Sequence, residues 1–341
     1  MTMPFLTAAL PGIGGQMRTL PEDFQVEERP LYLPCGEGEH LYIKIRKRLL
    51  STPDLVLRLS STLGVKAQAI GVAGLKDARA VTAQMISILG MTPDRLDRLK
   101  LDEQLLSVEV LGMHRNRLRP GHHAGNHFRL VIRDVATHAR ETVPLVTDML
   151  VRRGVPNYFG PQRQGRSGLN YQTGAELLVD PVRRNKLSRS KRMWYLNSYQ
   201  SHFFNDMLAR RLDRIDRLLV GDWAMKMDNG ACFLVEDATK EQPRADQFEI
   251  SPTGILFGSR VSWATGEPGE IERAVVVESG ATPESLTEAA KACGFRGERR
   301  SFRTLLADLD WALEGTVLTL SFSLPPGAYA TNVLRELMKT D

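Results

Sequence analysis

The sequence has few cysteines and no long apolar run. Its 341 residues include three cysteines, Cys35, Cys232 and Cys293, which are far apart and form no Cys-x-x-Cys pair. An odd, scattered set of cysteines argues against a disulfide framework and indicates a reduced, cytoplasmic environment. No apolar stretch approaches the roughly 18 residues that a membrane-spanning helix needs, so we expect no membrane association.

Internal repeats and low-complexity tracts are also absent. The composition, with 42% hydrophobic and 25% charged residues, is that of a globular protein of one large domain or two moderate ones. Such a chain can form a hydrophobic core without disulfide or metal staples. The net charge of +5 fits a polyanionic partner without requiring one. We see no sign of an obligate protein partner, and the oligomeric state stays open.

Two glycine-rich segments fail as loops that bind nucleotide phosphates. Between Gly71 and Lys76 the glycines lack the required spacing, and Asp77 stands where serine or threonine is needed. At residues 12–15 no strand precedes the glycines and no helix follows promptly. The common nucleotide-binding loops are therefore excluded at both places.

The N-terminal part of the chain predicts a mixture of strands and helices. Residues 40–47 alternate apolar with polar side chains, which predicts a half-buried strand with a basic outer face. Thr52-Pro53-Asp54 offers a capping hydroxyl, a proline and an early acid, so a helix should run from there to Gly64. Further strands are expected at residues 81–89, 105–111 and 128–135, and another helix at residues 143–153.

The pattern changes after Gly154. We expect a helix over residues 195–211, a hairpin turn at Asp228-Asn229-Gly230 and a Gly/Pro-rich loop at residues 251–254. Residues 316–324 return to strict alternation and predict a strand. A final helix carries the apolar residues between Val333 and Met338.

The segment around Lys76-Asp77 carries the strongest functional signal. A Lys-Asp pair after a glycine is ordinarily a solvated turn. Here, however, residues 74–84 read Gly-x-Lys-Asp-x-x-Ala-x-Thr-x-Gln, which resembles the signature segment of the TruD family of tRNA pseudouridine synthases. Four other segments resemble blocks of that family and follow in family order: Arg18–Glu28, Gly125–Phe128, Val155–Arg163 and Leu324–Leu337. Together the five segments span nearly the whole chain.

The resemblance implies a fold, a domain organisation and a substrate. The fold would be the α/β pseudouridine-synthase architecture with a mixed, largely antiparallel sheet. Residues 1–153 and 301–341 would form a discontinuous catalytic domain, residues 154–300 an inserted domain, and the cleft between them the RNA-binding site. The family's substrate is the uridine at position 13 of tRNA, and its reaction requires no cofactor or metal.

Asp77 corresponds to the family's catalytic aspartate. Forming pseudouridine breaks the N1–C1′ bond of uridine, turns the uracil and rejoins it through C5. An ionised carboxylate can attack a carbon of the nucleotide or remove a ribose proton, so attack at C1′, addition at C6 and a glycal route all stay open. Arg18 stands where the family usually has lysine and would be the neighbouring cation. Lys76 would point the other way along an extended stretch and is the poorer partner.

The resemblance also implies a set of residues that bind the uridine. Phe24, Phe128 and Tyr329 would stack on the base once it has left its own stack, and the Asn126 amide would bind a base edge or the ribose. The family usually has phenylalanine where Tyr329 stands, and also where Gln164 stands. From periodicity alone, Phe128 would instead join Leu130 and Ile132 on the buried face of its strand.

Three basic clusters, at residues 114–119, 183–192 and 299–303, are candidates for contacts with RNA phosphates. Four histidines near the first cluster, His114, His122, His123 and His127, could suggest zinc. Neither cysteine nor carboxylate lies among them, and the neighbouring arginines repel a cation, so we expect no metal site there.

Two other classes of function compete with the enzyme. A non-catalytic RNA-binding module would use the same aromatic and basic residues. The Asp77→Ala variant separates the two classes, because the enzyme would keep tRNA binding and lose pseudouridine formation. A glycosidase-like hydrolase would need a second carboxylate facing Asp77 across the scissile bond. Asp23, Glu27 and Glu28 are available, but no sequence pattern pairs them with Asp77.

Overall fold

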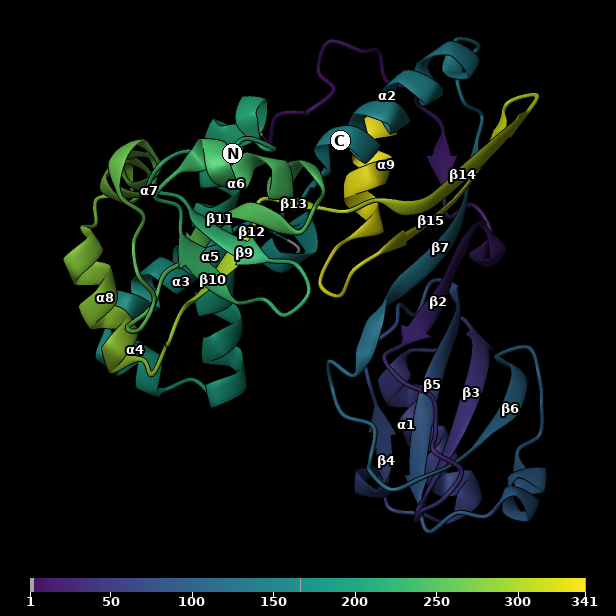
Figure 1. Ribbon diagram of the computed structural model, residues 1–341. Coiled ribbons are helices and arrows are strands. Elements are labelled where there is room, and N and C mark those ends of the chain that lie inside the picture. Colours follow the sequence, from purple (N-terminus) through teal and green to yellow (C-terminus); the bar gives the residue numbers. More distant parts are fainter. Residues whose placement is uncertain (1–2, 166, 341) are drawn as a thin grey trace. The chain divides into compact units, whose positions relative to one another are not determined.

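A computed structural model describes residues 3–165 and 167–340 of the chain (Figure 1). The chain forms two compact units. The first, here called the sheet unit, consists of Ile13–Glu141 and Leu306–Ala328. The second, the helix-rich unit, contains Thr142–Leu305, the chain up to Gly12 and the chain from Tyr329 onward.

The predicted inserted segment, residues 154–300, falls within the helix-rich unit, which also takes in residues 142–153, 301–305 and both terminal segments. A compact unit is a part of the chain with many internal contacts, whereas an inserted domain is a segment added within another domain. The limits of the two need not coincide. The boundaries at 153 and 300 therefore stay a prediction.

The sheet unit is built on nine strands in the order β14-β15-β7-β2-β5-β3-β6, with β1 paired to β7 and β4 to β5. Only the β2–β5 pair is parallel, and the other pairs in this unit are antiparallel. The prediction of a mixed, largely antiparallel sheet is confirmed. The strand bounds are β1 (Gln16–Met17), β2 (Phe24–Pro30), β3 (His40–Arg48), β4 (Ile70–Val72), β5 (Val81–Leu89), β6 (Leu105–His114), β7 (His123–Arg133), β14 (Ala307–Glu314) and β15 (Val317–Leu324).

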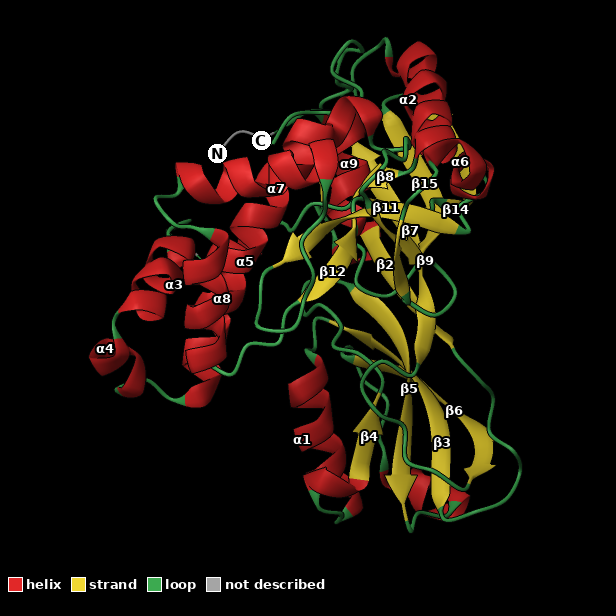
Figure 2. Cartoon of the chain, turned by 60° about the vertical axis from the view of Figure 1, so that its left-hand side comes forward, coloured by secondary structure: helices red, strands yellow, loops and turns green. Residues whose placement is uncertain are grey.

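The helix α1 (Thr52–Leu63) covers part of one face of this sheet, and Figure 2 shows it alongside β4. The Ser51 side chain caps its first turn by accepting from the backbone N–H of Asp54, and Gly64 ends it in the left-handed region with φ of 66°. Its leucines pack on the odd-numbered side chains of β3 and on β5, forming a core of Leu41, Ile43, Ile45, Leu55, Leu59, Leu63, Ile86 and Ile88. The helix predicted at Thr52 is confirmed, as is its end at Gly64, but the predicted capping residue is wrong. The capping hydroxyl belongs to Ser51, while Thr52 is the first helical residue and its hydroxyl binds Gln84.

The helix-rich unit is organised around the long helix α5. This helix packs against α3, α7 and strand β11, and Figure 2 shows the helices gathered around it. Four strands form the sheet β10-β9-β11-β12, and β8 pairs with β13. The bounds are α2 (Ala139–Arg153), α3 (Asn170–Val179), α4 (Pro181–Asn185), α5 (Arg189–Arg211), α6 (Ala238–Asp246), α7 (Gly266–Glu278), α8 (Pro283–Ala292), α9 (Ala330–Met338), β8 (Val155–Pro156), β9 (Trp223–Lys226), β10 (Cys232–Leu234), β11 (Ile250–Leu256), β12 (Glu298–Ser301) and β13 (Arg303–Thr304).

Five short 3₁₀ turns complete the described chain: Pro21–Asp23, Ala67–Ala69, Pro93–Arg98, Pro161–Gln164 and Leu212–Arg214. In residues 3–165 and 167–340, every helix is too short or too polar to span a bilayer.

The hairpin predicted at Asp228-Asn229-Gly230 joins β9 to β10 and is confirmed. The loop predicted at residues 251–254 is wrong, because these residues lie in β11 and are buried. Pro252 pairs with Ala224 of β9, and its carbonyl accepts a hydrogen bond of 2.9 Å from the backbone N–H of Phe302. Proline lacks a donor but keeps this acceptor, so the strand can pass through it.

Candidate active site

Asp77 lies in the loop between β4 and β5, and this loop is tied to the start of α1. The backbone N–H of Lys76 donates to Thr52 Oγ1 at 2.9 Å, and the Thr52 hydroxyl donates to Gln84 Oε1, also at 2.9 Å. The Asp77 side chain itself is 48% exposed. The carboxylate therefore stands on an anchored backbone while its oxygens stay open to a ligand.

Arg18 lies directly beside Asp77. Its Nη2 is 2.9 Å from Asp77 Oδ2, and its guanidinium carbon lies 4.0 Å from the centre of the Phe24 ring. Arg18 has a φ of 60°, in the left-handed region, which costs a residue with a side chain about 1 kcal/mol. The structure thus brings together three residues that the sequence analysis placed in one site.

Phe24 and Phe128 lie on the same face of the sheet, on the adjacent strands β2 and β7. Their ring centres are 6.3 Å apart in an edge-to-face arrangement, and Phe128 also contacts Phe322 of β15 with centres 5.5 Å apart. Both rings are buried, at 5% and 6% exposure. Burial supports the packing role that periodicity favours for Phe128, and the stacking role stays a prediction.

Asn126 is half-buried on β7, opposite Glu28 of β2. Its Oδ1 accepts a hydrogen bond of 2.8 Å from Lys76 Nζ, which also lies 2.7 Å from Glu28 Oε2. Lys76 therefore pairs with Glu28, whereas Asp77 pairs with Arg18, and Lys76 links the Asp77 loop to Asn126. The pairing of Glu28 with Lys76 has no signal in the sequence, because it depends on the register between β2 and β7.

Lys47 is a second lysine near Asp77 that the sequence analysis missed. It is fully buried, and its Nζ donates to the backbone carbonyl of Leu50. Burial lowers the pKa of Lys47 from its ordinary 10.5 to about 8, and the charge of Lys76 acts in the same direction. The alternation of β3 could have revealed it, because Lys47 continues the buried series of odd-numbered residues 41, 43 and 45.

Tyr329 belongs to the helix-rich unit, where it precedes α9 and is 38% exposed. Its neighbour there is Arg300, whose guanidinium lies 4.1 Å from the centre of the Phe159 ring. Burial lowers the pKa of Arg300 to about 10, and Tyr329 acts in the opposite direction. In the same unit Gln164 donates to the backbone carbonyl of Ser198 at 3.1 Å. The predicted place of Tyr329 beside the uridine stays a prediction.

The basic clusters differ in exposure. Within the third, Arg299 pairs with buried Glu272, and Arg303 donates to the backbone carbonyls of Arg153 and Ala245. Arg299 and Arg303 are 8% and 1% exposed, so the prediction that they contact phosphates is wrong. The physical reason is that both guanidiniums are used to satisfy buried acceptors.

In the second cluster Arg184 is also buried, where it donates to the carbonyls at the end of α3, whereas Lys186, Arg189 and Lys191 are exposed. In the first cluster Arg115 pairs with Glu37, and Arg117 donates to the carbonyl of Ile70 at 2.6 Å. The exposed residues of the second cluster and Arg119 of the first are therefore the remaining candidates for phosphate contacts.

Three of the four histidines of the first region, His114, His122 and His127, make side-chain hydrogen bonds. His122 Nδ1 lies 2.8 Å from the hydroxyl of Tyr32, and the two ring nitrogens of His127 lie 3.0 Å from the hydroxyls of Ser321 and Ser323. His114 accepts from the backbone N–H of Cys35. Over the described ranges, no three His, Cys, Asp or Glu side chains are grouped to hold a metal ion.

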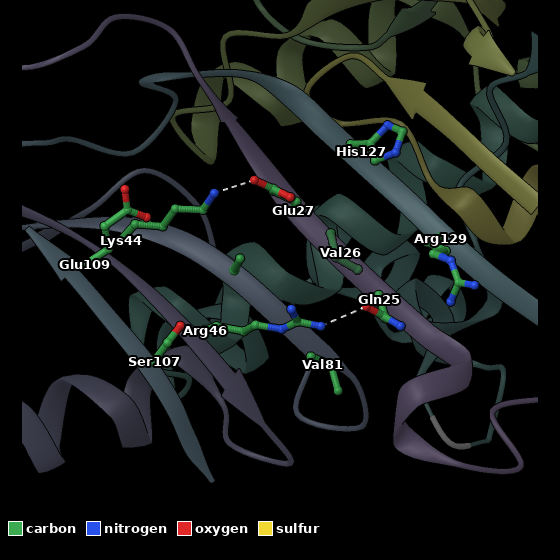
Figure 3. Close-up of a pocket in the computed structure, with 11 residues that line it drawn as sticks. Gln25, Val26, Glu27, Lys44, Arg46, Val81, Ser107, Glu109, His127 and Arg129 are labelled. Carbon is green, nitrogen blue, oxygen red and sulfur yellow. Dashed lines mark hydrogen bonds and ion pairs between the residues drawn. The ribbon is translucent and has the colours of Figure 1, made fainter. Parts of the chain in front are cut away.

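A groove of about 330 Å³ lies on the sheet unit and is lined by residues of several of its strands (Figure 3). Its lining includes Gln25 and Glu27, which alternate along β2 with Phe24 and Glu28 and so point to the other side. Figure 3 shows Lys44 reaching to Glu27 and Arg46 to Gln25, at 2.5 and 3.0 Å. Of the charged residues that line the groove, Lys44 and Glu27 form an ion pair. None of the residues that the sequence analysis predicted for the uridine site lines this groove.

Comparison with known proteins identifies the family. The family model for tRNA pseudouridine synthase D (TruD) matches residues 1–184 and 183–337. The tRNA pseudouridine synthase D of Thermus thermophilus is 44% identical, over 99% of this chain and 92% of its own. That of Syntrophotalea carbinolica is 41% identical, over 99% of each chain.

A solved structure shows the same fold. It is a crystal structure from Methanosarcina mazei assigned to tRNA pseudouridine synthase D (TruD), with a TM-score of 0.85 and 24% identity. The match covers 99% of this chain and 96% of that one. The family match, the relatives and the fold agree, and the chain belongs to the tRNA pseudouridine synthase D family.

Proposed function

We propose that the protein isomerises uridine to pseudouridine in tRNA, by family resemblance at position 13, with Asp77 as the catalytic carboxylate. The relatives from Syntrophotalea carbinolica and Thermus thermophilus are named tRNA pseudouridine synthase D, and their sequences match this chain over 99% of its length. The observation that supports Asp77 is its combination of an anchored loop, an exposed carboxylate and a guanidinium at 2.9 Å.

The reaction redistributes one bond and one proton. The N1–C1′ bond of the uridine breaks, the uracil turns, a C5–C1′ bond forms, C5 loses its proton and N1 gains one. The carboxylate of Asp77 starts the sequence by attacking C1′, by adding to C6 or by removing a ribose proton on the glycal route. Because reactant and product are isomers, no redox partner takes part, and the proposal includes neither cofactor nor metal.

The proposal also includes the uridine-binding residues. The target base leaves its stack, at a cost of a few kcal/mol, and stacks on aromatic side chains. Phe24, Phe128 and Tyr329 fill this role by family resemblance, and Asn126 binds the nucleotide through its amide. Residues 154–300 form the inserted domain, and the enzyme works in the cytoplasm on tRNA.

The test is to incubate the purified chain with an unmodified tRNA transcript and to map pseudouridine chemically along it. We expect a single modified site at position 13 and no free uracil by chromatography. Bound tRNA in which every uridine stays unchanged would instead identify a binding module. Release of free uracil would identify a hydrolase.

A further inference from the structure

Behind Asp77, three polar side chains from three elements form one buried chain of contacts. The side chains of Lys76 and Glu28 are 5% and 0% exposed. Lys76 Nζ lies 2.7 Å from Glu28 Oε2 and donates to Asn126 Oδ1 at 2.8 Å. The other oxygen of Glu28, Oε1, accepts from the backbone N–H of Met85 at 3.2 Å. The position of the lysine head is thus fixed from two sides.

Gly74 leaves room for this arrangement. A Cβ at residue 74 would lie 3.2 Å from Lys76 Nζ and 3.5 Å from Glu28 Oε2. Any side chain there would press on the lysine head, so the glycine of the signature segment has a packing reason next to this pair.

The lysine dictates which way the Asn126 amide faces. An ammonium group carries three donors and no acceptor, so only the amide oxygen can face it. Turning the amide over would place its NH₂ group against a buried cation and remove a hydrogen bond. Nδ2 is therefore left on the other side, and it makes no hydrogen bond within the sheet unit. The outward end of Asn126 can only donate.

We propose that Lys76 is a positioning residue that fixes Asn126 as a hydrogen-bond donor to a carbonyl oxygen of the target uracil. Uracil offers two such oxygens on its edges, and an amide donor held in one orientation selects for an acceptor. This inference rests on the proposed function and adds to it the polarity with which the base is recognised.

The first test is a double-mutant cycle for pseudouridine formation. Lys76→Met alone would leave the Glu28 charge buried and unpaired, which is strongly destabilising. Lys76→Met is therefore always combined with Glu28→Gln, which removes both charges together and keeps the acceptor for the Met85 N–H. The cycle compares the parent protein, Asn126→Ala, the Lys76→Met/Glu28→Gln pair and the triple variant, and thermal unfolding and tRNA binding are measured for each protein.

If Lys76 acts through Asn126, the Lys76→Met/Glu28→Gln pair lowers kcat roughly 10- to 100-fold when Asn126 is present. In the presence of Asn126→Ala the same change has little further effect, because the group that it positions is gone. A lysine that only anchors the Asp77 loop would lower kcat by the same factor in both cases, and that result overturns the proposal.

The second test needs no change at Lys76. The parent protein and Asn126→Ala are compared on tRNA that carries 2-thiouridine or 4-thiouridine at the target, since sulfur is a weak acceptor. We expect one of the two thio-substituted tRNAs to react more slowly with the parent protein, and Asn126→Ala to show no such difference. Equal rates for uridine and both thio-uridines would overturn the proposed contact. A parent protein that leaves all tRNA unmodified would instead refute the proposed function.

Discussion

At the scale of single residues, Arg18 makes two interactions at once, an ion pair with Asp77 and a stacking contact with Phe24. Its guanidinium binds Asp77 at 2.9 Å and lies 4.0 Å from the centre of the Phe24 ring. A flat guanidinium can stack and bind a carboxylate at once, whereas an ammonium group is a point charge. The arginine at this position therefore adds contact with Phe24 to the charge that the family's lysine supplies.

Arg18→Lys and Arg18→Met separate these two contributions. Arg18→Lys keeps the charge and loses the stacking, worth about 0.5–1 kcal/mol at an exposed site, so kcat should fall only a few-fold. Arg18→Met loses the charge and should lower kcat by roughly 10-fold or more. Steady-state kinetics on a tRNA transcript measure both, and full activity of Arg18→Met would show that the cation is dispensable.

Lys47 gives a prediction about stability and pH. In the unfolded chain its pKa is the ordinary 10.5, and in the folded chain it is about 8. Below about pH 8 Lys47 is protonated in both the folded and the unfolded chain. Between about pH 8 and 10.5 it is protonated only in the unfolded chain, so the free energy of unfolding should rise with pH. The contribution is about 3 kcal/mol over this window.

The measurement is urea unfolding of the parent protein and of Lys47→Met at several pH values from 7.5 to 10. The difference between the two isolates Lys47 from the other groups that titrate in this range. We expect the parent protein to gain stability relative to the variant as the pH rises. Parallel curves would show that the buried lysine keeps its ordinary pKa.

At the scale of elements, α1 and the Asp77 loop form one structural feature. Thr52, the first residue of α1, accepts from the Lys76 backbone N–H and donates to Gln84. Thr52→Val keeps the shape and leaves both partners unpaired, which should lower the free energy of unfolding by about 1–3 kcal/mol. Because the loop carries Asp77, kcat should fall as well.

Thr52→Ser is the matched control, since it keeps the hydroxyl and loses only a methyl group. Its kcat should stay close to that of the parent protein. Equal kcat for Thr52→Val and the parent would show that the loop holds its position without this contact. Urea unfolding and steady-state kinetics on the three proteins give both comparisons.

Elements with a regular pattern could be predicted from the sequence. The alternation of β3 and the end of α1 at Gly64 depend on neighbouring residues, which is why the sequence predicts both. The cap at the start of α1 is displaced by one residue, from the predicted Thr52 to Ser51. Strand β11 was missed because Pro252 and Gly254 indicate a loop locally, and only the strands on both sides of β11 show otherwise. Arg299 and Arg303 were misassigned because a buried arginine and an exposed one look the same in sequence.

The site itself was predictable mainly through the family resemblance. Asp77 by itself resembles a solvated turn, and Arg18 and Asn126 lie far from it in the chain. The signature segments placed them in one site, and the folded chain brings Arg18 to 2.9 Å from Asp77. The link from Lys76 to Glu28 and Asn126 could not be predicted, because it depends on the register of β2 against β7.

At the scale of the whole molecule, the net charge of +5 should make tRNA binding depend on salt. In the second basic cluster Arg183 is exposed but pairs with Glu176, and Lys186, Arg189 and Lys191 are the other exposed residues. If they contact phosphates, changing all three to alanine should weaken binding and reduce the slope of log affinity against log salt by about two.

A charge-matched control changes Lys226, Lys240 and Lys291, which are exposed elsewhere in the helix-rich unit. Both triple variants have the same net charge, so a difference between them reports on location. Filter binding of tRNA across a range of salt concentrations measures the slopes. Identical slopes for the two variants would show that the second cluster is merely solvated.

The central claim is that the Asp77 carboxylate performs the chemistry, and Asp77→Asn tests it most directly. The amide keeps the size of the side chain and removes the negative charge. We predict that the variant binds tRNA within about threefold of the parent protein and forms no detectable pseudouridine after many parent turnover times. Pseudouridine formed by Asp77→Asn at a rate near that of the parent protein would contradict the account.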